Sequence, residues 1–296
     1  MRTDETQATT HVAKQAPRRS IRRPSRAWQP YVKSLVMGLV LLVFIMPIIL
    51  VVLGSFKTTP QLIGDPLGIP SAPTLDSYAD AFKRMDYLNS LWNTAWITSC
   101  SVMAICFFGS MAAYFIARVA WRPNKIFFYL LVVSMIVPFQ VLMIPMIKIL
   151  GTLGLLKSSW ILVYVYLAEG VPLAVIMYSA YIRSIPVELD EAAMLDGASR
   201  RQTFFRVILP LLRPMTLTLV LLNTLFVWND FLLPFLVLRR QDQRTLTLTT
   251  LAFFQNHTTD YAPMMAALIL AMAPVFVLYL FFQRHIIAGL VRGAIK

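Results

Sequence analysis

The residues that most often do chemistry in proteins are few in this chain and are not grouped for it. The three histidines, His11, His257 and His285, are far apart and show no spacing typical of metal ligands. The two cysteines, Cys100 and Cys106, lie in one apolar run and would point in different directions on a helix. We therefore expect no metal site, no disulfide between these two cysteines and no catalytic residues.

Polar residues inside apolar runs are stronger candidates for a functional site. Glu169 lies in one such run, and Asp230 lies in another, directly after Trp228 and Asn229. Ionisable residues inside membrane-spanning segments are costly and usually serve a function. We therefore expect a substrate path to include some of these residues, and packing between helices is the alternative for each of them. The candidates are Glu169, Trp228, Asn229 and Asp230, with Gln140 as a weaker one.

The segment 183–214 separates two apolar runs and carries dense local signals. Ser184 can cap a first helix, whose first turn would then be acidic. Negative charge is favourable there because the amino end of a helix carries partial positive charge. The acidic residues are Glu188, Asp190 and Glu191.

The same segment also predicts where the first helix ends and a second one begins. Ala192 and Ala193 favour a helix, and their small side chains let another surface approach the backbone closely. Gly197 stands where the helix would stop, in a position that suits a left-handed residue. Ser199 and Gln202 then form a capping box that starts the second helix.

The composition requires a membrane environment for these elements. Hydrophobic residues make up 58% of the chain and charged residues only 14%, against about 25% charged residues in an ordinary soluble domain. The apolar residues gather into runs of about 20 residues, the length of a helix that crosses a bilayer. These runs lack the polar stripe of a soluble helix. The expected spans are roughly 34–56, 93–117, 126–147, 160–182, 215–237 and 263–283.

Positive charge is divided unevenly between the two sides of such a bundle. Nineteen of the 27 Lys and Arg residues fall on the side of the amino terminus, which indicates that both termini are cytoplasmic. We expect residues 1–33 to be a disordered basic tail and residues 34–296 to be the transmembrane domain. A basic segment directly before a membrane helix is more simply a topology and lipid-surface signal than a nucleic-acid site.

The spacing within 183–214 resembles the EAA loop of ABC-importer permeases, whose pattern is EAA-x3-G-x9-I-x-L-P. The chain departs from that pattern only by Val for Ile. The segments IPVELDEAAMLDGAS and VWNDFLLPFLVL, and the ending QRHIIAGLVRGAIK, resemble carbohydrate-importer permeases of the maltose and multiple-sugar type. The resemblance covers roughly residues 30–296. The matching EAA-loop residues are Glu191, Ala192, Ala193, Gly197, Val207, Leu209 and Pro210.

The resemblance implies a fold and a function. The fold is an all-α membrane protein with six transmembrane helices and a cytoplasmic coupling helix, as in type I ABC importers. The function is that of a permease subunit in an ATP-driven sugar or oligosaccharide importer of the bacterial cytoplasmic membrane. An amphipathic helix on the membrane surface is the alternative for the loop. The residues expected to dock on the ATPase are Glu188, Glu191, Ala192, Ala193, Asp196 and Gly197.

The resemblance also implies partners: a second homologous permease, two ATP-binding subunits and an extracytoplasmic solute-binding protein. The chain contains no GxxxxGK[ST] sequence, so we expect ATP and Mg²⁺ on the partner subunits and no cofactor in this chain. The segment 238–262 either reaches into the binding protein or is an ordinary loop, and the alternation over Thr245–Thr250 could form a short strand.

Two other classes of protein remain as alternatives. A secondary transporter driven by an ion gradient usually carries internal repeats and charges in broken helices. The sequence shows no repeat, and the charges that qualify are Glu169 and Asp230. An intramembrane enzyme would need a nucleophile beside a base, or a metal site, and no such grouping occurs in the apolar runs.

Overall fold

The structure is a computed structural model that describes residues 29–254 and 260–294. Its contacts divide the chain into two units, Met1–Ile48 and Ile49–Lys296, which we describe separately. The predicted disorder of the basic tail concerns residues that lie mostly outside the described part, and His257 lies outside it as well.

The first unit contains most of helix α1 (Gln29–Ser55), which begins more than one turn before the predicted start of the first span. The stretch Tyr31–Ser55 is long and apolar enough to cross a membrane. Its side chains are largely exposed, as is that of Phe44 at 75%. A helix that is apolar all round suits a lipid or protein surrounding rather than water.

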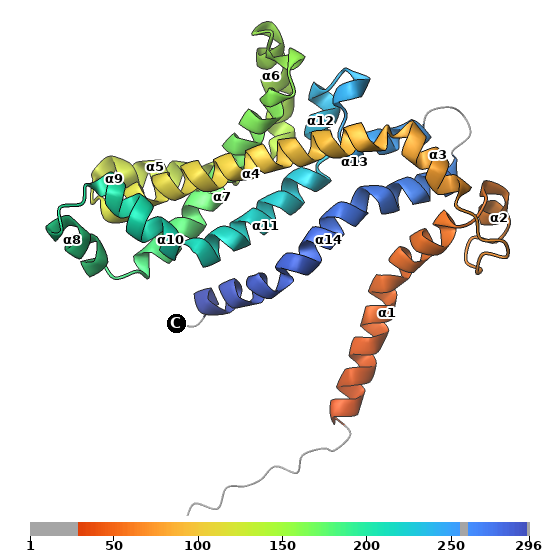
Figure 1. The fold of residues 1–296 in the computed structure, drawn as a ribbon, viewed down its shortest axis with the longest axis horizontal. Coiled ribbons are helices and arrows are strands. Elements are labelled where there is room, and N and C mark those ends of the chain that lie inside the picture. Colours follow the sequence, from red (N-terminus) through yellow and green to blue (C-terminus); the bar gives the residue numbers. More distant parts are fainter. Residues whose placement is uncertain (1–28, 255–259, 295–296) are drawn as a thin grey trace, which may run out of the picture. The chain divides into compact units, whose positions relative to one another are not determined.

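The core of the second unit consists of four long helices that lie side by side (Figure 1). They are α4 (Tyr87–Arg118), α7 (Trp160–Arg183), α11 (Arg213–Asn229) and α14 (Tyr261–Ala294). Helix α4 packs against α7 and α11, and α11 packs against α14. A Cβ atom on Gly109 would lie 2.7 Å from the Cβ of Ala174. Small residues thus let α4 and α7 approach closely, as is common between membrane helices.

The predicted span 126–147 is wrong as a single helix. The structure has α5 (Arg122–Ser134) and α6 (Phe139–Thr152), bent by 101° from each other. Pro138 lies at the break in extended backbone, with φ −62° and ψ 135°. Proline lacks the amide hydrogen that would continue the first helix, and it disfavours helical backbone in the residue before it.

The predicted span 215–237 is interrupted as well. Helix α11 ends at Asn229, Asp230 is extended, and a short helix α12 (Leu232–Val237) follows. Before α11, a helical stretch runs from Arg200 to Leu211 and bends by 73° at its junction with α11. It comprises α9 (Arg200–Thr203), a π-helical segment (Phe204–Ile208) and α10 (Leu209–Leu211).

The described residues contain four uninterrupted helices that are long and apolar enough to cross a membrane, and six such spans if each bent pair counts as one. The uninterrupted ones are Tyr31–Ser55, Tyr87–Arg118, Trp160–Arg183 and Tyr261–Phe281. The prediction of an all-α membrane protein is confirmed. The breaks within two predicted spans are the main departure from it.

The connecting segments are helical too. Short helices α2 (Thr59–Gly64) and α3 (Asp76–Arg84) follow α1, and α8 (Glu188–Leu195) lies in the 183–214 loop. The strand suggested for Thr245–Thr250 is wrong, because α13 (Leu246–Thr249) and a 3₁₀ turn occupy that stretch. No strand occurs in residues 29–254 or 260–294.

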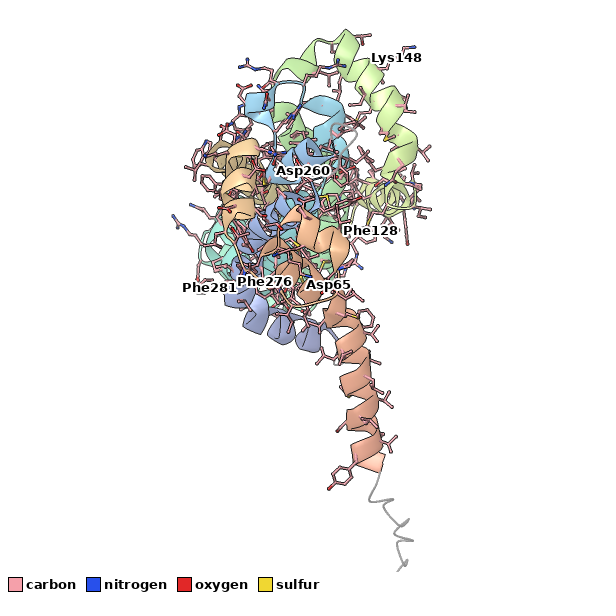
Figure 2. The ribbon with its side chains drawn as sticks, turned by 90° about the vertical axis from the view of Figure 1, so that its right-hand side faces the viewer. Asp65, Phe128, Lys148, Asp260, Phe276 and Phe281 are labelled. Carbon is pink, nitrogen blue, oxygen red and sulfur yellow. The ribbon has the colours of Figure 1, made fainter. Side chains whose placement is uncertain are left out.

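The second unit exposes many large apolar side chains. Phe276 and Phe281 on α14 are 59% and 71% exposed (Figure 2). Large exposed apolar surfaces mark contact with lipid or with another protein chain. The buried side chains of the unit include Tyr178 and Leu219 in one core cluster and Tyr166 in another.

Candidate functional site

Helix α8 presents the side chains that the sequence predicts for docking. The exposed residues are Glu188, Glu191, Ala192, Asp196 and Gly197, and Ala193 is half-buried. Within the described part of the chain, no hydrogen bond or ion pair engages the carboxylates of Glu188, Glu191 and Asp196. Two free carboxylates on α8 and a third directly after its last residue form an acidic surface that suits a basic partner.

The backbone around α8 fixes where this helix begins and ends. Ser184 does not cap it, contrary to the prediction, because its hydroxyl donates to the carbonyl of Tyr181 at 2.7 Å. At the other end Gly197 adopts φ +83°. The amide of Ala198 donates to the carbonyl of Ala193 at 3.0 Å, which closes the helix with a Schellman motif.

The helical stretch Arg200–Leu211, which we call the second loop helix, begins at the predicted capping box. The amide of Gln202 donates to the hydroxyl of Ser199 at 3.3 Å, and the amide of Ser199 donates to the side-chain oxygen of Gln202 at 2.7 Å. The capping box is confirmed, and it holds the turn between the two helices.

One acidic residue of α8 points inward instead of outward. Asp190 is 3% exposed, and its Oδ1 accepts a hydrogen bond from the hydroxyl of Tyr114 at 2.7 Å. Its Oδ2 lies 3.0 Å from Nε of Arg118, a close ion pair that is not aligned as a hydrogen bond. Arg118 also donates to the carbonyl of Ile185 at 2.9 Å. Residues at the end of α4 therefore bind both α8 and the segment that leads into it.

A groove of about 330 Å³ lies beside this contact. It is bounded by the end of α4, by α8 and by the second loop helix. Glu191 lines it from α8, and Arg200 and Arg201 line it from the second loop helix. The groove leaves the side of α8 that faces the second loop helix accessible.

The structure brings two of the predicted intramembrane acids together. Oδ2 of Asp230 accepts a hydrogen bond from the hydroxyl of Tyr166 at 2.8 Å, and Oδ1 accepts one from the amide of Leu232 at 3.0 Å. Glu169 is half-buried and close enough to interact electrostatically with Asp230 and Tyr166. Asp230 thus links the first residue of α12 to α7. Among the described residues, the carboxylate of Glu169 makes no hydrogen bond.

The other predicted polar residues are separate from this pair. Trp228 is buried, and its Nε1 donates to the carbonyl of Ala271 on α14 at 3.2 Å. The side-chain amide of Asn229 donates to the carbonyl of Leu225 within its own helix at 2.8 Å. Gln140 is exposed at the start of α6.

A cavity of about 580 Å³ lies between α4, α11 and α14. Trp228 and Cys106 line it, together with hydroxyl residues of α4 and α11 that the sequence reasoning missed. Single hydroxyl residues in apolar runs do not predict a cavity from the sequence, because only the packing of the helices brings them together. The hydroxyl residues are Thr98, Ser99, Thr216 and Thr224.

The described part of the 238–262 segment is held against the bundle. The side-chain amides of Asn89 and Asn93 each donate to the carbonyl of Asp242 at 2.8 Å. The guanidinium of Arg240 donates two hydrogen bonds to the carboxylate of Asp242 and thereby lowers the pKa of that carboxylate. This stretch therefore presents a fixed surface beside the first turns of α4.

The match to a known family decides the class of this protein. The family described as "Binding-protein-dependent transport system inner membrane component" matches residues 105–292. The chain belongs to this family. It is therefore an integral protein of the inner membrane and a transport permease, and the family generally works with ATPase and binding-protein components.

Two curated relatives extend the match over most of the chain. The probable starch degradation products transport system permease protein AmyC of Thermoanaerobacterium thermosulfurigenes is 38% identical, over 88% of this chain and 95% of that protein. The multiple sugar-binding transport system permease protein MsmG of Streptococcus mutans is 37% identical, over 90% of this chain and 96% of that protein.

A solved structure supports the fold. A bacterial ABC transporter involved in the import of the acidic polysaccharide alginate contains a chain that aligns with a TM-score of 0.77 at 22% identity. The alignment covers 88% of this permease and 98% of that chain. The permease thus has the fold of an ABC-importer membrane subunit.

Proposed function

We propose that this permease is one of two homologous membrane subunits of an ATP-driven importer of sugars or oligosaccharides. It lines half of the path, and two separate ATP-binding subunits bind ATP and Mg²⁺. A solute-binding protein delivers the sugar on the extracytoplasmic side. Both termini and the 183–214 loop lie in the cytoplasm, as the distribution of Lys and Arg indicates.

The observation that carries the coupling role is the outward face of α8. Glu188, Glu191 and Asp196 are exposed and unpaired among the described residues, whereas Asp190 is neutralised inside the protein. A helix lying on the membrane surface would instead carry Lys and Arg on its polar face. An acidic face fits a basic cleft on a protein partner.

The sugar class is supported by the relatives, whose names describe the transport of starch degradation products and of multiple sugars. Glu169 and Asp230 provide two neighbouring carboxylates, and Trp228 provides an aromatic side chain that lines the cavity between α4, α11 and α14. Neither the relatives nor the described structure favours an ion-coupled secondary transporter.

The charge reversal Glu191→Lys tests the docking role. We expect the variant to insert normally and to lose most of the ATP-binding subunit on co-purification, because a lysine would repel a basic cleft. Asp80→Lys is the control, since Asp80 is partly exposed on α3, far along the chain from α8. Full recovery of the ATP-binding subunit with Glu191→Lys would remove α8 from the docking surface.

The sugar class is tested by uptake into proteoliposomes that hold the complete importer. Labelled maltotriose and raffinose are the probes, each supplied with the binding protein. We expect ATP inside the vesicles to drive uptake of at least one of them, and a proton gradient alone to drive none. Uptake driven by the gradient without ATP would support the secondary transporter instead.

A further inference from the structure

Helix α4 is suited to carry motion from one end of the bundle to the other. It runs for 32 residues, which is about 48 Å at 1.5 Å per residue. Among the four uninterrupted spans of the described chain, it alone has no internal proline. Kinks in helices occur mostly at proline, so α4 is expected to be the stiffest of these spans.

The last turns of α4 hold α8 through a buried charged contact. Asp190 and Arg118 have side chains that are 4% and 13% exposed, and they lie 3.0 Å apart. The hydroxyl of Tyr114 donates to the same carboxylate at 2.7 Å. Exposed ion pairs hold helices only weakly, whereas a buried pair resists separation because each group would be left without a partner.

The first turns of α4 hold the segment at the opposite end of the bundle. Asn89 and Asn93 donate to the carbonyl of Asp242, and Asn93 also contacts the carbonyl of Arg244 at 3.2 Å. The hydroxyl of Thr94 accepts a hydrogen bond from the amide of Leu246 at 2.9 Å. One stiff helix thus has polar contacts to a loop at each of its ends.

We infer that Asp190 is a positioning residue that locks α8 to the end of α4, so that a displacement of α8 is transmitted along α4 to residues 242–246. The inference rests on the proposed function, because it assumes that an ATP-binding subunit moves α8. Docking and transmission are then divided between neighbouring residues. Glu188 and Glu191 face the partner, and Asp190 faces the permease.

The isosteric variant Asp190→Asn tests this role in the complete importer, reconstituted in proteoliposomes. It removes the charge that pairs with Arg118 and keeps an oxygen for the hydroxyl of Tyr114. We expect the normal amount of ATP-binding subunit and continued ATP hydrolysis. The sugar transported per ATP should fall at least about fivefold, the lower end of typical coupling between sites.

Asp80→Asn is the matched control, because it also removes a carboxylate from an ion pair, with Arg84 in α3. We expect its ratio of transport to hydrolysis to equal that of the wild type. A wild-type ratio for Asp190→Asn would overturn the inference. Loss of the ATP-binding subunit from that variant would also overturn it, because Asp190 would then act in docking.

A second variant keeps the test decisive if the Asp190→Asn permease itself does not fold or insert into the membrane. Tyr114→Phe removes a single hydroxyl and leaves the ion pair with Arg118 in place. We expect it to lower the transport ratio by less than Asp190→Asn, and we expect the double variant to be no worse than Asp190→Asn alone. Residues that act through one contact give such non-additive effects. A wild-type ratio for Tyr114→Phe, or independent additive losses, would contradict the shared contact.

Failure of this inference and failure of the proposed function give different results. If the permease does not serve an ATP-driven sugar importer, wild-type vesicles show no ATP-dependent uptake of maltotriose or raffinose. If only the inference fails, the wild type transports one of these sugars and Asp190→Asn does so with the same ratio.

Discussion

The carboxylates of Asp190, Asp230 and Glu169 are accommodated in different ways. Asp190 is balanced by a guanidinium and a phenol, and Asp230 by a phenol and a backbone amide. Glu169 has neither kind of partner within the described residues. A group that is already bonded stabilises the fold, whereas an unbonded one is available to a solute. Glu169 is therefore the better candidate for sugar contact, and Asp230 has a clear structural role.

For Asp230 we predict that Asp230→Ala destabilises the permease by about 1–3 kcal/mol, because it leaves the hydroxyl of Tyr166 and the amide of Leu232 without a partner. Asp230→Asn should cost less, since its side-chain oxygen can still accept one of these hydrogen bonds. Thermal unfolding in detergent measures the difference. Asn229→Ala is the control, because it removes only a bond within α11. Equal unfolding temperatures for Asp230→Ala and the wild type would show that these bonds do not stabilise the native state.

For Glu169 we predict that substitution lowers sugar uptake without lowering stability. Glu169→Gln should leave the unfolding temperature unchanged or raise it, because a half-buried carboxylate without a partner carries a cost of desolvation. Sugar uptake should fall by about tenfold or more if the carboxylate binds a hydroxyl of the sugar, as charged hydrogen bonds contribute about 1.5–3 kcal/mol. Uptake assays with labelled maltotriose and raffinose decide this point. Normal uptake would take Glu169 out of the path.

At the scale of elements, the close approach of α4 and α7 depends on glycine. A Cβ atom on Gly109 would lie 2.7 Å from the Cβ of Ala174, and that atom cannot move without its backbone. Gly109→Ala should therefore destabilise the permease by about 1–3 kcal/mol through overpacking. The matched control is Gly64→Ala on α2, where no atom lies within 4 Å of the new methyl group. Unfolding temperatures of the two variants should differ by several degrees, and equal temperatures would mean that α4 and α7 are not packed this closely.

The elements also show which features the sequence could predict. The end of α8 at Gly197 and the capping box at Ser199 follow from local backbone rules, and both are present. The break before α6 at Pro138 and the end of α11 at Asn229 both fall inside continuous apolar runs. Hydropathy does not predict them, because it carries no information on the direction of the backbone. The alternation over Thr245–Thr250 suggests a strand, whereas the structure has a helix at Leu246–Thr249, whose first amide donates to Thr94 on α4.

The candidate site, like the fold, could be predicted from the sequence only in part. The outward residues of α8 are exposed as a docking surface requires, and their docking role stays a prediction from the spacing of the loop. The inward role of Asp190 was missed, because its partners Tyr114 and Arg118 are far away in the sequence. A carboxylate next to Glu191 looks like any other charge in an acidic first turn. Only the packing of α8 on α4 distinguishes the two.

At the scale of the whole molecule, the proposed orientation requires α8 and the segment after α1 to lie on opposite sides of the membrane. Positive residues favour the cytoplasmic side, and the larger share of Lys and Arg falls on the side of α8. Leu195 on α8 and Ile69 after α2 suit a labelling test, because they are 89% and 82% exposed. Single cysteines at these positions, in a background without Cys100 and Cys106, can be probed with a membrane-impermeant maleimide.

We predict that Ile69→Cys is labelled in intact cells and that Leu195→Cys is labelled only in inside-out vesicles. With the ATP-binding subunit present, labelling of Leu195→Cys should fall at least severalfold, because burial in an interface excludes the reagent from the thiol. Labelling of Ile69→Cys should not change with that subunit, which makes it the internal control. Labelling of Leu195→Cys from outside would reverse the orientation and place α8 beyond the reach of any cytoplasmic ATPase. Labelling from inside without protection would keep the orientation but contradict docking at α8, so the two parts of the proposal can fail separately.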